Sequence, residues 1–521
     1  MGDEVSDDQQ HRRGPSRRAL VVGATAVAAA VAVPVAVRAT HADDSGTAAA
    51  ADSPSPTRQA PAARRVPAAT ASPSTSPSTS PSPRARSDHR PNILLVLTDD
   101  QPKETEWALR RTVDWLGGQG VTFARAHANT PLCAPSRASI MSGRYAHNHG
   151  VLDTRHPNHL DQRTTVQRRL HETGYRTGLF GKYLNYWHPA DNPPHFDEWL
   201  LQEPVAYNNG HYNDNGTVRT IPGYNTTVIK DRALAFIERS RTDTRPWFAY
   251  VATRSAHEVN IPEKKYADTR VPEWQGRPSV TETGTTDKAD KPPYVRRARH
   301  TLAEGKALRT RQLRTLLSVD DAMRDFHDKL RELGQLDNTL VLFTSDHGLC
   351  WGDHGWLRKS VPYRPSLEVP FYLSWPAAGL GGASRARTDD RLTGHIDIAP
   401  TLLAAAGTTA DTPHDGHSLL DPGNDRDHLL AEWWWNQQDK TPIHTWASYI
   451  GKSEQYTEYY RTRLDDGGRP KGTGEVLFRE YYDLRADPYQ LTNRLYGASA
   501  EEERRLGVPG LAEKLAAARK A

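Results

Sequence analysis

The chain has 521 residues, of which 36% are hydrophobic and 25% charged, proportions typical of a water-soluble globular protein. Its formal net charge is only +4, and most of that excess lies in the first 90 residues. No broad basic surface follows from this charge, so we expect no nucleic-acid partner. With two cysteines, Cys133 and Cys350, the chain cannot build a disulfide framework and can form one bridge at most.

Residues 1–42 are typical of an export signal. An arginine-rich start precedes an uninterrupted apolar run over residues 19–37, and Thr40-His41-Ala42 loosely fits a cleavage site. The run is also just long enough to span a membrane, so a retained signal-anchor is the alternative and would be the only membrane contact. Both interpretations predict an exported protein, either secreted or tethered at the outer face of the cell membrane or cell wall.

Residues 43–90 consist mainly of Ala, Pro, Ser and Thr and include "ASPSTSPSTSPSP". A segment of this composition cannot bury a core, so we predict a disordered tether between the export signal and the folded part.

From Pro91 onward, apolar strand candidates alternate with helical patterns, which indicates an α/β fold over residues 91–410. The expected architecture is a large, mostly parallel sheet sandwiched by helices. The predicted strands are residues 92–97, 174–181, 246–253, 339–346 and 368–375. The predicted helices are residues 104–116, 165–173, 226–239, 307–333 and 395–407.

The alternation ends near Gly407. A tryptophan cluster at "EWWWN", a glycine-rich "RLDDGGRPKGTGE" suited to a hairpin, and a helix from about Val508 follow. We therefore predict a smaller C-terminal α+β subdomain over residues 411–521, with an antiparallel sheet and a terminal helix.

Two predicted strands end in acidic groups: one in "LTDDQ", with Asp99 and Asp100, the other in "TSDHG", with Asp346 and His347. Ligands of open α/β sheets bind at the carboxyl ends of the strands. Adjacent carboxylates after buried strands are costly unless a cation lies between them, and oxygen ligands favour Ca²⁺ or Mg²⁺. Capping of the following helices is the alternative role for these aspartates.

Cys133 precedes a short helical pattern, "PSRASIM", which Pro135 can begin and Gly143 can end. A thiol at a helix N-terminus has a lowered pKa, because the helix dipole favours its negative form. A small buried cysteine without chemistry is the alternative.

The segment "CAPSRASIMSGR" resembles the signature of the formylglycine-dependent sulfatases, members of the alkaline phosphatase superfamily. "PNILLVLTDDQ", "GKYLN", "TSDHG" and "YYDLRADP" also match this family in order, so the resemblance covers residues 91–494. The motifs are most similar to the branch of N-acetylglucosamine-6-sulfatases and heparan sulfate 6-O-endosulfatases. The resemblance implies a sulfatase-like fold and the hydrolysis of sulfate monoesters, on a small molecule or a sulfated glycan.

The resemblance also implies that a formylglycine-generating enzyme oxidises Cys133 to Cα-formylglycine during maturation. A thiolate that attacked a sulfate ester would form a stable thiosulfate. A hydrated aldehyde carries two hydroxyls instead: one attacks sulfur, and the other expels sulfate as the carbonyl re-forms, which splits a difficult reaction into two easier steps.

The same resemblance assigns roles to further residues. Asp99, Asp100, Asp346 and His347, together with residue 133, would hold one divalent cation, with Ca²⁺ expected and Mg²⁺ as the alternative. Arg137 would stabilise the hydrated aldehyde. The residues that would contact sulfate or the leaving oxygen are Lys182, His257 and Lys359, with Arg358 as the alternative to Lys359.

The chain departs from the family pattern at two places. Val259 stands where relatives usually carry the second proline of Pro-His-x-Pro, and Ala256 stands where they carry the first. Asn185 replaces a histidine that serves many relatives as general base, and an amide cannot take up a proton near neutral pH. His147 or His149 could take that role, so the identity of the base stays open.

Other functions remain open at this stage. A phosphonate monoester or phosphodiester hydrolase of the same superfamily shares the cysteine signature and the metal carboxylates, although Lys182 and Lys359 together favour sulfate. A non-catalytic binder of sulfated glycans would have lost part of the catalytic set, which is nearly complete here. A disulfide between Cys133 and Cys350 is the outcome we consider if modification fails.

Overall fold

The computed structural model describes residues 90–520 except 204–205, 282–287, 383–385 and 436–441. The predicted export signal, residues 1–42, and residues 43–89 of the predicted tether lie outside the described residues. None of the helices in the described part of the chain has both the length and the apolar character needed to cross a bilayer.

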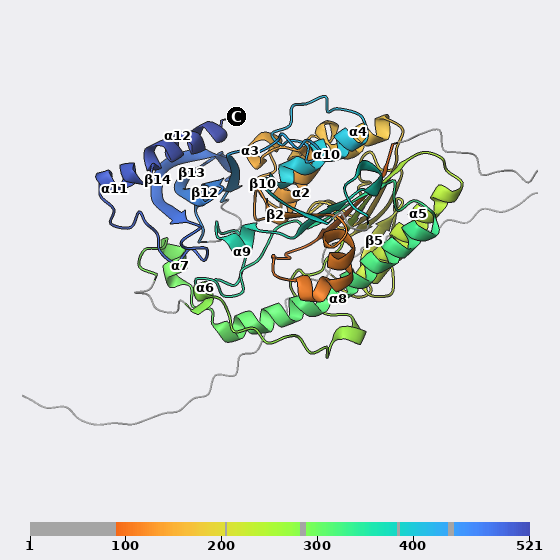
Figure 1. Cartoon of the computed structure of the whole chain (residues 1–521), viewed down its shortest axis with the longest axis horizontal. Helices are drawn as coiled ribbons and strands as arrows, with labels where there is room; N and C mark the ends of the chain where they lie inside the picture. Colours follow the sequence, from red (N-terminus) through yellow and green to blue (C-terminus); the bar gives the residue numbers. More distant parts are fainter. Residues whose placement is uncertain (1–89, 204–205, 282–287, 383–385, 436–441, 521) are drawn as a thin grey trace, which may run out of the picture. The chain divides into compact units, whose positions relative to one another are not determined.

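Ten described strands form one large mixed sheet in the order β10-β2-β9-β8-β1-β7-β3-β4-β5-β6 (Figure 1). The central run from β8 to β4 is parallel, whereas β9, β5 and β6 run antiparallel to their neighbours. The predicted α/β sandwich is therefore confirmed. The strands are β1 Asn92–Thr98, β2 Val121–His127, β3 Arg176–Gly181, β4 Glu198–Gln202, β5 His211–Asp214, β6 Thr217–Thr220, β7 Trp247–Ala252, β8 Thr339–Ser345, β9 Phe371–Ser374 and β10 Arg387–Gly394.

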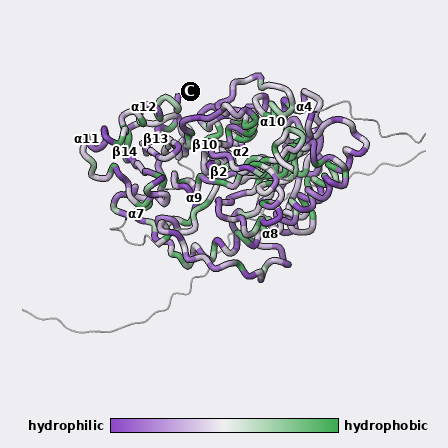
Figure 2. Tube along the Cα trace, viewed as in Figure 1, coloured by the Kyte–Doolittle hydropathy of each residue, from purple (hydrophilic) through white to green (hydrophobic). Residues whose placement is uncertain are grey.

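Strand β1 lies at the centre of the sheet, and all seven of its residues are buried. A strand covered on both faces needs apolar side chains on both, which is why residues 93–97 form an unbroken apolar run between Asn92 and Thr98. Alternate side chains enter two different cores: Leu95 belongs to one cluster and Leu94 to the other. One face is covered by α2 Cys133–Ser142, α4 Val166–Glu172 and α10 Ile398–Ala405, the other by α5 Asn225–Glu238 and α8 Leu302–Glu332 (Figures 1 and 2).

Four of the five predicted helices occur close to their expected positions, as α4, α5, α8 and α10 with its preceding 3-10 turn His395–Asp397. Residues 104–116 differ from the prediction, because they form a 3-10 turn Glu106–Leu109, a short α1 Arg110–Thr112 and a π turn Val113–Gly117. The carboxylate of Asp320 accepts hydrogen bonds from the backbone N–H groups of Arg111 and Thr112. A side chain of α8 thus satisfies amides that a regular helix would pair within itself.

The C-terminal region forms an antiparallel four-stranded sheet of β11 His428–Trp433, β12 Thr445–Gly451, β13 Glu454–Leu464 and β14 Pro470–Asp483. The predicted glycine-rich hairpin connects β13 to β14. Helices α11 Ala500–Arg505 and α12 Val508–Ala518 follow (Figure 1), and Leu515 of α12 packs against Tyr456 on one face of the sheet. On the other face, Trp446 and Ile450 share a core with Ile396 of the larger unit. The predicted smaller α+β subdomain is therefore present.

Candidate active site

The two acidic pairs follow neighbouring parallel strands. Thr98 of β1 is the register partner of Ser345 of β8, so the residues after both strands emerge at the same edge of the sheet. The backbone N–H of Asp100 donates a hydrogen bond to Oδ1 of Asp346 over 3.1 Å. The strand register therefore brings together the carboxylates that sequence reasoning placed at strand ends.

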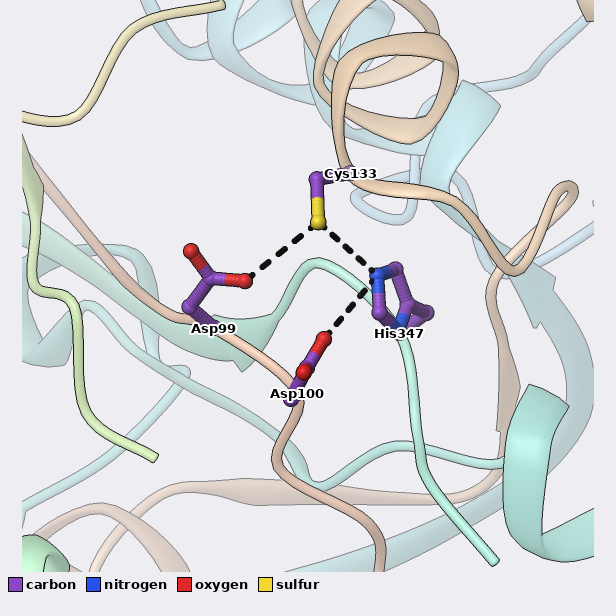
Figure 3. Close-up of side chains that lie close together, drawn as sticks. All are labelled: Asp99, Asp100, Cys133 and His347. Atoms are coloured by element: carbon purple, nitrogen blue, oxygen red, sulfur yellow. Dashed lines mark hydrogen bonds and ion pairs between the residues drawn. The ribbon is translucent and has the colours of Figure 1, made fainter. Parts of the chain in front are cut away.

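Cys133 is the first residue of α2, which ends at Gly143 with a left-handed φ of 68°. Its side chain points into a group formed by Asp99, Asp100 and His347 (Figure 3). The Sγ atom lies 3.5 Å from Oδ1 of Asp99 and 3.4 Å from Nε2 of His347. The helix N-terminus and two strand ends thus converge on the thiol.

Four side chains offer a set of cation ligands. One atom each of Asp99, Asp100, Cys133 and His347 lies within 4.8 Å of the others, and all four residues are buried. Nδ1 of His347 lies 2.9 Å from the Gly348 carbonyl. A proton on Nδ1, donated to that carbonyl, would make Nε2 the atom available to a cation. Two carboxylates and one imidazole suit a divalent cation and fit Ca²⁺ or Mg²⁺, although the nitrogen ligand is less typical of Ca²⁺.

The fifth predicted ligand, Asp346, does not belong to this group of four. Its Oδ2 accepts a hydrogen bond from Nε of Arg137 at 2.9 Å, and its Oδ1 accepts the N–H of Asp100. Oδ1 nevertheless lies 3.6 Å from Nε2 of His347, at the margin of the group. Asp346 therefore holds Arg137 in this structure and stays within reach of a cation only through Oδ1.

Three cationic side chains surround the carboxylates. Lys182, directly after β3, pairs with Asp99. Lys359 lies with Nζ 2.5 Å from Oδ1 of Asp100 and 3.1 Å from Sγ of Cys133. Arg137 is fully buried and also donates to the Lys182 carbonyl over 2.9 Å. The three predicted cations thus converge on the thiol and its acidic neighbours.

These charges shift the pKa values of the acidic groups in the site. Burial acts to raise the pKa of Asp99, but Lys182 and the other nearby cations prevail and hold that pKa well below its usual value. Burial and Asp99 likewise act to raise the pKa of the Cys133 thiol, yet Lys182 and Lys359 lower it well below the ordinary range. The pocket therefore stabilises negative charge at position 133.

His257 lies in the loop after β7. Its Nε2 is 3.8 Å from Oδ2 of Asp100, and Nδ1 is 2.6 Å from the carbonyl oxygen of Glu258. Burial acts to lower the pKa of His257, but Asp100 reverses this and raises it. The hydroxyl of Tyr207 donates to the His257 carbonyl over 2.5 Å. His257 therefore faces the site although Ala256 and Val259 replace the usual prolines.

The structure also shows where the residues considered as alternatives lie. Nδ1 of His147 bonds to Glu432 at 2.9 Å, and Nε2 of His149 bonds to the hydroxyl of Ser139 at 3.1 Å, so both rings have structural partners. Arg358 is exposed, whereas Lys359 enters the site. Cys133 and Cys350 are both free thiols, and no disulfide joins them in the described residues.

Sequence reasoning missed several supporting residues. Gln312 of α8 donates to the Asp100 carbonyl over 2.9 Å and to the Ala256 carbonyl over 3.1 Å. Its Oε1 accepts the indole N–H of Trp351 over 2.6 Å. This one buried amide connects three loops of the site, but its position in a long amphipathic helix gave no local signal.

A cleft of about 450 Å³ opens beside the site on the side of Lys182 and His257. The side-chain oxygen of Asn185, which lines it, is buried and has no hydrogen-bond partner among the described residues. The volume is large enough for a small ligand of drug or sugar size. The remaining lining residues are Tyr186, Trp187, His188, Pro189, Glu203 and Arg254.

Comparison with known proteins agrees with this architecture. The sulfatase family model matches residues 91–408, and the model of the N-sulphoglucosamine sulphohydrolase C-terminal region matches residues 352–520. The chain therefore belongs to the sulfatase family, as the signature around Cys133 predicted.

Two relatives support the predicted branch of that family. The extracellular sulfatase SULF-1 homolog of Drosophila melanogaster is 31% identical over 372 residues, which cover 67% of this chain and 32% of that protein. The N-acetylglucosamine-6-O-sulfatase of Bacteroides thetaiotaomicron is 25% identical over 475 residues, which cover 78% of this chain and 82% of that protein. The chain spans 49% and 32% of the length of the two extracellular sulfatase homologs that it matches, from Caenorhabditis elegans and Drosophila melanogaster.

Solved structures establish the fold. A structure with bound D-glucosamine-2-N,6-O-disulfate, the substrate of that protein, aligns with a TM-score of 0.65 and 21% identity over 83% of this chain and 98% of the other. The phosphonate monoester hydrolase of Agrobacterium radiobacter also aligns with a TM-score of 0.65, at 22% identity over 83% and 96%. The fold is thus shared by enzymes with different substrates.

Proposed function

We propose that this protein is an exported sulfuric-ester hydrolase that hydrolyses sulfate monoesters of sulfated sugars and releases sulfate. The observation that carries the proposal is the position of Cys133, whose Sγ lies between two carboxylates, His347 and Lys359. A buried thiol would not need this many charged neighbours for packing alone. The surroundings suit a residue that carries oxygen and negative charge during a reaction.

In this proposal, a formylglycine-generating enzyme uses an external oxidant such as dioxygen to convert the CH₂SH group of Cys133 to an aldehyde, and the sulfur leaves as hydrogen sulfide. Water then adds to the aldehyde and gives a hydrate with two hydroxyls. One hydroxyl attacks sulfur, so that a new O–S bond forms while the S–O bond to the sugar breaks and the sugar leaves as an alcohol. The second hydroxyl then loses its proton as the carbonyl re-forms and sulfate departs. Water restores the hydrate.

The neighbouring side chains have distinct tasks. Arg137, locked by Asp346, orients the hydrate through its guanidinium. Lys182 and Lys359 approach from two sides and bind the sulfate oxygens as negative charge moves onto them. His257 supplies the proton for the leaving oxygen, and the base that accepts the hydroxyl proton stays unassigned because Asn185 cannot act as one.

The residues that would hold a divalent cation are Asp99, Asp100, His347 and residue 133, with Asp346 reaching it through Oδ1. Such a cation, Ca²⁺ or the alternative Mg²⁺, acidifies an attacking hydroxyl and neutralises sulfate oxygens. Lys182 pairs with Asp99 and Lys359 with Asp100, so both lysines also lie beside these ligands.

The cleft beside Lys182 supports a sugar as the leaving group. Trp187 and Tyr186 offer aromatic rings for stacking on a pyranose, and Asn185 and Glu203 offer groups for its hydroxyls. The names of the relatives, an N-acetylglucosamine-6-O-sulfatase and extracellular sulfatases, agree with this substrate class and with an exported location.

A substrate comparison tests the proposal. Purified protein, expressed with a formylglycine-generating enzyme, is assayed with glucosamine 6-sulfate, a phosphonate monoester and a phosphodiester at equal concentration, alongside Cys133→Ala. We expect the highest kcat/KM on the sulfate ester and none for the variant. A preference for the phosphonate or phosphodiester would replace the proposal with the alternative hydrolase. Tight binding of sulfated sugar without turnover would indicate a binding protein.

A further inference from the structure

The loop that carries Lys359 lies between β8 and the short helix α9 Arg364–Leu367 and contains no regular helix or strand. Nζ of Lys359 lies 2.5 Å from Oδ1 of Asp100 and 3.1 Å from Sγ of Cys133. Because no helix or strand holds the backbone of this lysine, contacts from other parts of the protein have to keep Nζ in that position. Within the loop, the backbone carbonyl of Lys359 accepts a hydrogen bond from the indole N–H of Trp356 over 3.2 Å.

Support comes from the C-terminal sheet. The indole N–H of Trp446 on β12 donates to the Ser360 carbonyl over 3.0 Å. The side-chain amide of Gln455 on β13 donates to the Pro362 carbonyl over 2.5 Å. Both carbonyls belong to the three residues that directly follow Lys359, and both donors are buried.

A third contact holds Tyr363, the residue that directly follows Pro362. The hydroxyl of Tyr363 donates to Oε1 of Glu480 on β14 over 3.0 Å. Glu480 is fully buried and also accepts hydrogen bonds from Tyr482 over 2.7 Å and from Tyr459 over 2.6 Å. A carboxylate held by three phenols in the core cannot turn away, so it is a rigid anchor for Tyr363.

We infer that the C-terminal sheet positions Lys359 in the active site, through Trp446, Gln455 and Glu480 on three successive strands. The sheet contributes none of its own side chains to the group around Cys133, but it fixes the backbone from which Lys359 reaches that group. The catalytic consequence rests on the proposed function of Lys359, whereas the positioning itself does not.

Chemical labelling tests the positioning without reference to activity. Folded protein is treated briefly with acetic anhydride, and peptide mass spectrometry reports the labelling rate of each lysine. Tyr363→Phe removes one oxygen and should raise the labelling rate of Lys359 about threefold or more, since a hydrogen bond to a buried charge is lost. Tyr175→Phe removes an equally buried hydroxyl, which bonds to the Pro91 carbonyl away from the loop, and should leave that rate near the wild-type value.

Trp446→Phe is the second variant, because it removes a different contact from the same segment. It should raise Lys359 labelling as Tyr363→Phe does, while the rate for Lys182 stays unchanged in both. Unchanged Lys359 labelling in both folded variants would overturn the inference. An equal rise in Tyr175→Phe would also overturn it, because the effect would then be a general loosening of the structure.

A kinetic cycle then separates the inference from the proposed function. If Lys359 acts in catalysis, Tyr363→Phe should lower kcat/KM about fivefold in the wild type and less than about twofold in a Lys359→Ala background. An undiminished effect in that background would contradict action through Lys359. Altered labelling without any sulfatase activity in the wild type would leave the positioning intact and refute the proposed function.

Discussion

Thr98 and Ser345 are register partners at the ends of two neighbouring parallel strands, and the acidic pairs after them meet because of this pairing. The hydrogen bond from Asp100 to Asp346 closes the gap between the two loops. A one-residue slip of β8 against β1 would turn these side chains to opposite faces of the sheet. The chemistry of the site thus depends on the register of its two central strands.

A divalent cation should stabilise the folded protein by mass action. With Ca²⁺ at about a hundredfold excess over its Kd, the expected gain is about 2–3 kcal/mol over protein in EDTA. Thermal unfolding with and without Ca²⁺ measures this gain. Asp100→Asn should lose most of the Ca²⁺-dependent shift in Tm, while the exposed Asp268→Asn should keep it. Equal shifts in both variants would place the cation elsewhere.

Removal of Lys182 should affect turnover far more than folding. Lys182→Ala deletes a cation that the proposed mechanism places against sulfate, and the loss of one such group costs about 10²–10³ in kcat. Steady-state kinetics on a sulfate ester measures this, with the exposed Lys264→Ala as the matched control. A decrease below about threefold would show that Lys182 serves only to neutralise Asp99.

Aromatic contacts in the cleft should determine sugar binding. Trp187→Ala should raise KM for a sulfated sugar about tenfold, since stacking area is lost, with little change for a small aryl sulfate that does not fill the cleft. The exposed Tyr489→Ala serves as control. Parallel changes for both substrates would argue that Trp187 supports the fold and does not bind the sugar.

The pair of half-buried His147 and buried Glu432 should make stability depend on pH. Glu432 overcomes the effect of burial and raises the pKa of His147, and His147 in turn lowers the pKa of Glu432. Asp415 adds to the first shift and Arg519 opposes it. The contribution of the histidine is complete below its unfolded pKa of about 6.5 and is lost as pH rises through the higher folded value. That of the glutamate is complete above about 4.5 and is lost as pH falls.

His147→Gln should therefore lower Tm relative to wild type by about 2 °C near pH 6 and by less near pH 9. Thermal unfolding at the two pH values measures the difference, with the exposed His171→Gln as control. A Tm difference that grows toward pH 9 would have the wrong sign for a pair in which both residues are charged.

The sequence predicts those strands whose burial requires a recognisable run of apolar residues. Strand β1 has a central apolar run, residues 93–97, because both its faces are buried, and such a run predicts a strand. Strands β6 and β10, with "TVRT" and "RTDDRLTG", are largely exposed at the sheet edges and have no apolar run. Strands β2, β4 and β5 were also missed, since polar residues interrupt each of them.

The residues of the candidate site likewise fall into two groups, those that a local motif predicts and those that only the folded structure shows. Asp99, Cys133 and Lys182 lie in short motifs at strand or helix ends, where position alone indicates chemistry. Gln312 and Glu480 act on the site from distant segments, and their partners are set by tertiary packing. No spacing in the sequence connects Glu480 to Lys359, so only the folded structure shows that relationship.

The central claim is that residue 133 ceases to be a cysteine. Mass spectrometry of the tryptic peptide that contains it, from protein coexpressed with a formylglycine-generating enzyme, tests this directly. Formylglycine at position 133 would make this peptide lighter by about 18 Da than the cysteine form, because CHO replaces CH₂SH. An unmodified thiol in protein that is active and loaded with metal would contradict the formylglycine mechanism.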